Sequence, residues 1–109
     1  MQQLSAPDAH ALLQAQPDAL VLDVREPWEV RVARLALPAE RQLFIPMATV
    51  PLRLAEIPPS QPVVCICHHG ARSAQVVAFL ERQGHAQVYN LAGGIEAWAT
   101  QVDAPVPRY

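Results

Sequence analysis

The chain of 109 residues contains no lysine, only two cysteines and no apolar run long enough to cross a membrane. A bilayer needs roughly 18–20 consecutive apolar residues, and residues 1–13 show no basic start before an apolar stretch, so neither a spanning helix nor a secretory leader is predicted. The basic residues are eight arginines spread along a chain of net charge −2, without the basic patch that binds nucleic acid. We therefore expect a cytoplasmic protein that contacts neither nucleic acid nor a membrane.

The two cysteines, Cys65 and Cys67, stand too close in sequence to cross-link distant parts of a fold, which argues against a secreted disulfide scaffold. On one strand they would lie roughly 6.5–7 Å apart, at or beyond the limit for a direct bridge. We expect Cys65 to fill the core, with a redox or resolving role as the alternative. Cys67 is the candidate for a reactive thiol, and a merely buried cysteine is its alternative.

Glycine and charge are also scarce, with four glycines against eleven prolines and 17% charged residues, while 51% of the chain is hydrophobic. This balance is typical of a globular protein with short elements joined by stiff turns. We expect one domain over residues 1–109, which buries roughly 60–70% of the surface of the unfolded chain. Its last segment, residues 102–109, is predicted to be extended over the surface. No apolar stripe is left over for an obligate dimer, so we expect a monomer or weak dimer.

Hydrophobic patterning predicts strands and helices that alternate along the chain. The predicted helices cover residues 6–15, 26–30, 51–56 with Thr49 as a cap, 71–83 and 95–100, and the predicted strands cover 20–24, 43–45, 63–67 and 88–91. Such alternation implies parallel strands with right-handed crossovers, so we expect an α/β three-layer sandwich. Ligands bind beyond the carboxyl ends of the strands in these sheets, which points to the loop that begins at Cys67.

The sequence after Cys67 favours a thiolate there. A thiol is a useful nucleophile only as its anion, and an ordinary cysteine with a pKa of about 8.5 is mostly protonated at neutral pH. A helix is predicted to begin four residues later, and the first N–H groups of a helix have no partners inside it. With the positive end of the helix dipole they form a cradle for an anion at Cys67 or at a sulfur bonded to it. Gly70 allows the loop to curl, Arg72 adds a permanent cation, and Ser73 adds a hydroxyl.

The loop resembles the active-site loop of rhodanese domains, and it reads Cys67-His68-His69-Gly70-Ala71-Arg72-Ser73. Residues 22–29 resemble the Asp-x-Arg signature of that family, residues 90–98 its C-terminal signature, and residues 102–105 its usual tail. The resemblance covers nearly the whole chain and implies a five-stranded parallel sheet with Leu4 near the first strand. It also implies that Cys67 accepts sulfur and that the N–H groups of residues 68–73 surround the resulting persulfide.

The resemblance further implies a sulfurtransferase reaction in two halves. The thiolate attacks the outer sulfur of a donor such as thiosulfate, expels sulfite and becomes a persulfide. An acceptor such as cyanide or a thiol, including a thiol on a sulfur-accepting protein, then removes the extra sulfur. This is covalent catalysis with ping-pong kinetics, and it requires neither a metal nor an organic cofactor.

Two other functions remain open at this point: a non-catalytic rhodanese-like module that binds or regulates, and an oxyanion enzyme such as a phosphatase or arsenate reductase. In the related oxyanion enzymes five residues separate the cysteine from the arginine, whereas four separate Cys67 from Arg72 here. The shorter ring should be too tight for a tetrahedral oxyanion and sufficient for one sulfur atom. The intact Cys67 also weighs against an inactive module.

Where many rhodaneses carry a Gly-His-Ile-x-Gly-Ala segment, this chain has different residues at 34–39, which predicts a differently shaped pocket rim. Asp23 and Arg25 flank the end of a buried strand, where charged residues are usually paired. We expect them to form an ion pair or hydrogen bonds that support the Cys67 loop. Either Asp23 or Glu29 is then available to Arg72.

The paired histidines of the loop have several possible roles. The spacing of His68 and His69 fits no zinc pattern, so no metal site is predicted. One of them could act as an imidazolium that attracts an anionic donor or steadies the thiolate, and the alternative is a loop histidine facing water. Because the loop has histidines where a basic residue could stand beside the cysteine, a thiosulfate dianion would meet less fixed positive charge. Trp28, Phe44 and Trp98 are expected in the core or the pocket wall.

Overall fold

The computed structural model describes residues 1–109 and has five strands, four α-helices and three 3₁₀ segments. The strands are β1 (Gln2–Leu4), β2 (Leu20–Asp23), β3 (Gln42–Phe44), β4 (Val63–Ile66) and β5 (Val88–Leu91). The helices are α1 (Ala6–Ala15), α2 (Pro27–Val32), α3 (Ala71–Arg82) and α4 (Gly94–Gln101), and the 3₁₀ segments are η1 (Ala39–Arg41), η2 (Met47–Thr49) and η3 (Pro51–Glu56). None of these helices combines the length and the apolar character that crossing a membrane requires.

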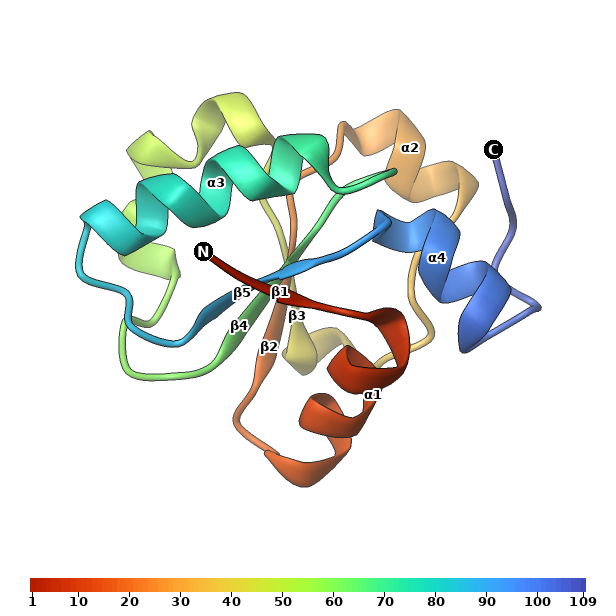
Figure 1. Ribbon diagram of the computed structural model, residues 1–109. Coiled ribbons are helices and arrows are strands. Elements are labelled where there is room, and N and C mark those ends of the chain that lie inside the picture. Colours follow the sequence, from red (N-terminus) through yellow and green to blue (C-terminus); the bar gives the residue numbers. More distant parts are fainter.

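All five strands run parallel in one sheet, in the order β1-β5-β4-β2-β3. Helices α1 and α4 cover one face of the sheet, and α3 covers the other face together with η2 and η3 (Figure 1). This confirms the predicted α/β fold, with a five-stranded parallel sheet between helical layers. Leu4 lies in β1, as the family resemblance implied, and β4 occupies the middle of the sheet.

Alternation along the central strand β4 divides the core into two parts. Successive side chains of a strand point to opposite faces, so Val64 and Ile66 pack with α1 and α4, while Val63 and Cys65 pack with α3. The same alternation places Cys67, one residue beyond β4, on the α3 side. The candidate nucleophile therefore faces the helix that follows it in sequence.

Local signals account for the first turn of two helices. The Ser5 hydroxyl accepts a hydrogen bond from the Asp8 N–H at 3.2 Å and so caps α1. Helix α3 begins directly after Gly70, whose φ of +106° lies in the left-handed region that favours glycine. This turn lets the first N–H groups of α3 point back toward the end of β4.

The helix predicted at 51–56 is present with these bounds, but it is the 3₁₀ helix η3 rather than an α-helix, and inside it Arg53 has the non-helical angles φ −113° and ψ 21°. Thr49 does not cap it, since the Thr49 hydroxyl donates to the Pro46 carbonyl at 3.0 Å. Prolines lack an N–H donor, and their density in this part of the chain favours short turns over a continuous helix. Strand β3 also begins one residue earlier than predicted.

The end of the chain is not simply extended over the surface as predicted. After α4 the chain turns, with the Val106 N–H donating to the Asp103 carbonyl at 3.0 Å, and Val106 enters the core beside α1 and α4. The last residues then bring Tyr109 to α2, where its ring lies edge-on to Trp28 with centroids 6.0 Å apart. Burial of Val106 outweighs the proline pattern on which the prediction depended.

The three aromatic residues expected in the core or pocket wall have different environments. Trp98 is 3% exposed and packs in the core, as predicted. Phe44 is half-buried on β3. Trp28 is 54% exposed on α2, where its ring makes a T-shaped contact with Tyr109, so the prediction of a core position is wrong for this residue.

The burial of Leu80 on α3 leads to a testable prediction about stability. Leu80 is fully buried between α3 and the sheet, so Leu80→Ala should lower the free energy of unfolding by about 2–5 kcal/mol through lost burial and a residual cavity. Leu52→Ala is the matched control, because Leu52 is 89% exposed and its truncation should change the stability by less than about 0.5 kcal/mol. Urea unfolding measures both, and equal effects of the two substitutions would contradict the placement of α3.

Candidate active site

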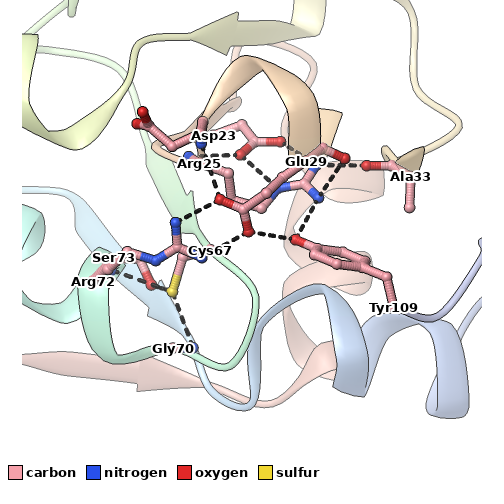
Figure 2. A network of polar contacts seen from close by, with 10 residues as sticks. Asp23, Arg25, Glu29, Ala33, Cys67, Gly70, Arg72, Ser73 and Tyr109 are labelled. Carbon is pink, nitrogen blue, oxygen red and sulfur yellow. Dashed lines mark hydrogen bonds and ion pairs between the residues drawn. The ribbon is translucent and has the colours of Figure 1, made fainter. Parts of the chain in front are cut away.

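The chain curls around the sulfur of Cys67 immediately after β4. The N–H of Gly70 donates to Cys67 Sγ at 3.0 Å, and the N–H of Ser73 donates to it at 3.4 Å (Figure 2). Both belong to the start of α3, where N–H groups lack partners within the helix and the helix dipole is positive. The loop is closed around one sulfur atom, and Cys67 itself is only 1% exposed.

The first turn of helix α4 donates hydrogen bonds to the carbonyl oxygens of this loop. The N–H of Ile95 donates to the Cys67 carbonyl at 2.9 Å, and the N–H of Glu96 donates to the His68 carbonyl at 3.2 Å. A β-carbon on Gly94 would lie 2.3 Å from the His68 carbonyl oxygen, so only glycine permits this close approach. Because α4 accommodates the carbonyl oxygens, the N–H groups of the loop are left to face the sulfur.

Ser73 and Asn90 form a buried polar pair beside the sulfur. The Ser73 hydroxyl lies 3.3 Å from Cys67 Sγ and 2.5 Å from Asn90 Oδ1, and Asn90 Nδ2 donates to the Gly70 carbonyl at 3.1 Å. A hydroxyl has one proton, so Ser73 donates either to Asn90 or to the sulfur. While it donates to Asn90 it can accept the proton of a Cys67 thiol, and it must rotate to donate to a thiolate.

The sequence alone does not single out Asn90 as a functional residue, although it lies within the C-terminal signature at 90–98. Its amide joins β5 to two parts of the cradle, the Gly70 carbonyl and the Ser73 hydroxyl, and it also donates to Gln3 on β1 at 3.0 Å. Only the pairing of β5 with β4 brings it there. A polar residue at an otherwise buried strand position is the signal that could have identified it.

Arg72 pairs with Glu29 rather than Asp23. Its two terminal nitrogens donate to the two carboxylate oxygens at 2.6 and 2.8 Å, a bidentate arrangement. The hydrogen bonds from Arg72, aided by one from Tyr109, lower the pKa of Glu29 from 4.5 to about 2, and Glu29 in turn raises the pKa of Arg72. The permanent cation of the loop is therefore matched by a carboxylate from α2.

Asp23 and Arg25 form the expected ion pair at the end of β2. Arg25 donates from Nε and Nη2 to the two Asp23 oxygens at 2.9 and 2.7 Å, and both side chains are fully buried. Burial works to lower the pKa of Arg25, but its hydrogen bonds with Asp23 and the Asp23 charge outweigh burial and raise it. Arg25 also donates to the Ala33 carbonyl at 2.7 Å, which ties β2 to the end of α2.

Tyr109 joins these two ion pairs, a contact that the sequence did not indicate. Its hydroxyl donates to Glu29 Oε2 at 2.7 Å and accepts from Arg25 Nη1 at 3.0 Å (Figure 2). Its ring stacks on His68 with centroids 3.9 Å apart and an interplanar angle of 11°. A residue at the far end of the chain thus becomes part of the surroundings of the Cys67 loop.

The two histidines stack on each other with centroids 3.9 Å apart, so the His68 ring lies against both His69 and Tyr109. Burial, followed by the nearby His69, lowers the pKa of His68, so His68 is neutral at neutral pH rather than the imidazolium considered from the sequence. No group of three or more His, Cys, Asp or Glu side chains is arranged to hold a metal ion. The stacked rings of His69, His68 and Tyr109 therefore form an aromatic rim beside the loop, and His68 adds no positive charge to it.

Cys65 lies in the core below the loop and is fully buried. Burial raises the pKa of its thiol far above the ordinary value, with a further contribution from the charge at Cys67. A thiol held in its neutral form is a poor nucleophile. The structure therefore supports the core-filling interpretation of Cys65 over a redox role.

The sequence of residues 5–101 matches the model of the rhodanese-like domain family. The chain belongs to this family. Over 82 residues it is 46% identical to a sulfurtransferase of Allochromatium vinosum, an alignment that covers 75% of this chain and 73% of the relative. A rhodanese-like sulfurtransferase is thus the class that the comparisons support.

Solved structures agree on the fold. A rhodanese-related protein of Thermoplasma volcanium is 28% identical, with a TM-score of 0.82 and complete coverage of both chains. The polysulfide-sulfur transferase homodimer of Wolinella succinogenes is 31% identical, with a TM-score of 0.79, and the alignment covers 100% of this chain and 80% of that one. These likenesses extend over the sheet and the Cys67 loop together.

The Glu29–Arg72 pair predicts an acid-dependent loss of stability. Because the pKa of Glu29 is lower in the folded chain than its ordinary 4.5, its stabilisation is complete at higher pH and is lost as the pH falls toward about 2. Between about pH 5.5 and pH 2 the wild type should lose about 2–3 kcal/mol of unfolding free energy from this group. Urea unfolding across this range measures the loss.

Glu29→Gln should remove that part of the pH dependence. Glu56→Gln is the control, since the Glu56–Arg53 ion pair is exposed and solvent screens it, so the slope should hardly change. A Glu29→Gln variant with the wild-type slope would show that Glu29 is not the group that titrates.

Asn90→Asp should slow the reaction of Cys67 with iodoacetamide at fixed neutral pH by about tenfold, because it places a negative charge beside the sulfur and holds the Ser73 proton more strongly. Mass spectrometry of alkylated peptides measures the rate at Cys67 separately. Gln3→Glu adds the same charge at the exposed partner of the Asn90 amide and should have little effect. Unchanged alkylation in Asn90→Asp would mean that the pair does not act on the sulfur.

Proposed function

We propose that this protein transfers a sulfane sulfur from a donor to a nucleophilic acceptor through a persulfide on Cys67. The observation that carries the proposal is the convergence of two N–H groups on Cys67 Sγ, at 3.0 and 3.4 Å, in a chain of the rhodanese-like family. Thiosulfate is one candidate donor, and cyanide or a thiol, including a thiol on another protein, is a candidate acceptor. Asp23 and Arg25 support the loop, and His68 through Ser73 form it.

The transfer takes place in two balanced steps. The Cys67 thiolate attacks the outer sulfur of the donor, a new S–S bond forms, and the old bond breaks with its electron pair on the leaving group, which is sulfite when thiosulfate is the donor. The acceptor then attacks the outer sulfur of the persulfide and returns the electron pair to Cys67 as a thiolate. Each step begins or ends with negative sulfur at the same place, where the N–H groups from Gly70 and Ser73 stabilise it.

The paired state of Arg72 weighs against the oxyanion enzymes. A phosphate or arsenate dianion is best held by a free bidentate guanidinium, but both ends of the Arg72 fork already bind Glu29. The four-residue spacing from Cys67 to Arg72 points the same way. A purely regulatory module has no need for N–H groups directed at a cysteine sulfur, so that alternative is not favoured either.

Intact-mass spectrometry tests the proposal directly. Incubation with thiosulfate or with a low-molecular-weight persulfide should add one sulfur atom, and cyanide should then remove it as thiocyanate. Cys67→Ser should abolish the gain, while Cys65→Ser should retain it because the Cys65 thiol is buried and neutral. Sulfur retained by Cys67→Ser, or equal dependence on Cys65, would require a different mechanism.

p-Nitrophenyl phosphate and arsenate serve as substrates for the rival activity. We expect neither to be turned over. Turnover that depends on Cys67 would replace the sulfurtransferase proposal with an oxyanion enzyme.

A further inference from the structure

The permanent positive charge around Cys67 is cancelled within the fold. Glu29 holds both ends of the Arg72 guanidinium, and with a pKa of about 2 it stays ionised at neutral pH. Asp23 holds Arg25 in the same way, and that pair is fully buried. Arg72 of the loop and Arg25, which is linked to it through Tyr109 and Glu29, thus each have their charge paired.

The remaining groups at the rim add little fixed positive charge. His68 is kept neutral by its burial beside His69 and Tyr109. His69 is exposed, and it is a histidine at a position where a lysine or arginine would add a fixed charge. Arg108 is paired with Glu96. The net charge of −2 on the whole chain also opposes the approach of an anion.

The enclosure of the sulfur limits the shape of the donor as well. Cys67 is 1% exposed, so only the narrow end of a donor molecule can reach its sulfur. A persulfide ends in two consecutive sulfur atoms that carry no side groups. In thiosulfate, the atom directly behind the outer sulfur carries three oxygens.

We propose that the donor is a persulfide carried on a thiol, R–S–SH, rather than thiosulfate or another multiply charged anion, and that Glu29 sets this preference by neutralising Arg72. The inference rests on the proposed transfer through Cys67 and narrows it to one class of donor. Glu29 touches neither donor nor sulfur, so it is a specificity-determining residue that acts through Arg72.

The charges of the two possible reactions differ at every stage. When the Cys67 thiolate attacks the terminal sulfur of R–S–SH, a Cys67–S bond forms and the donor S–S bond breaks. The electron pair leaves on R–S⁻, and the hydrogen stays on the transferred sulfur. The reacting pair carries one negative charge when the persulfide is protonated and two when it is ionised, whereas a thiolate with thiosulfate carries three. A site with no unpaired arginine favours the smaller charge.

Three donors separate charge from intrinsic reactivity: the persulfide of 2-mercaptoethanol, the persulfide of 2-mercaptoethanesulfonate, and thiosulfate. The first two share the same reactive S–S bond and differ by one remote sulfonate. The first, whose R group is uncharged, is called the neutral persulfide, and the second the sulfonated persulfide. The rate of sulfur gain on wild-type Cys67 is measured for each and divided by the rate of the same donor with a free thiol. We expect the neutral persulfide to exceed thiosulfate by at least about tenfold, with the sulfonated persulfide between them.

Ionic strength gives a second measurement that needs no variant. Added salt screens repulsion between like charges, so it should speed the reaction with thiosulfate more than the reaction with the persulfide of 2-mercaptoethanol.

The variant Glu29→Gln should shift the preference between donors. It removes the carboxylate and leaves the cation of Arg72, whose side chain is 36% exposed, available to an anion. The normalised rate with thiosulfate should rise by about tenfold relative to the neutral persulfide. Glu56→Gln is the matched control, because it changes the net charge equally by releasing Arg53 from an exposed ion pair on η3, and it should leave the ratio unchanged.

Two results would overturn the inference. One is a normalised wild-type rate with thiosulfate that equals the rate with the neutral persulfide. The other is a Glu29→Gln variant, folded by circular dichroism, in which all three donors change by the same factor. Failure of the proposed function itself is a different result, since Cys67 would then gain sulfur from none of the donors.

Discussion

Two backbone N–H groups directed at one sulfur atom are the constraint on which the rest of this site depends. A loop can point its N–H groups inward only if its carbonyl oxygens find partners elsewhere. Helix α4 supplies N–H donors for the carbonyls of Cys67 and His68, and the Asn90 amide supplies one for the carbonyl of Gly70. Gly94 is needed because any side chain there would strike the loop. The signature at the C-terminal end of the chain is thus part of the same cradle as the cysteine.

The charged residues around the Cys67 loop stabilise the structure more than they add positive electrostatic potential at the sulfur. Asp23 with Arg25 and Glu29 with Arg72 are two bidentate pairs, and the Tyr109 hydroxyl joins them into one network. Removing one member of a buried pair leaves the other charge uncompensated, so such pairs hold β2, α2 and the loop in fixed positions. A negative charge on the Cys67 sulfur must then be stabilised mainly by the backbone N–H groups of Gly70 and Ser73. Two such donors can stabilise one singly charged atom.

Local patterns were sufficient for the elements that carry the site. The short runs at 20–24 and 63–67 predicted the strands β2 and β4, and the helical period that begins at Ala71 predicted the start of α3. Prediction was poorer around residues 46–58, where proline and short apolar segments fit several kinds of turn. It failed for the tail, because the burial of Val106 depends on a core formed by α1 and α4, which lie elsewhere in the sequence.

The sequence by itself determined the fold class, the family, the position of the cysteine at the end of a parallel strand, and the first turn of the helix behind it. These follow from spacing, periodicity and glycine placement within short windows. Only the tertiary structure decided that Arg72 pairs with Glu29 rather than with Asp23. The same holds for the hydrogen bond between Ser73 and Asn90, and for the one from the Tyr109 hydroxyl to Glu29. Each of these contacts joins residues at least 17 positions apart, and such pairings depend on strand order and helix packing, which no local pattern contains.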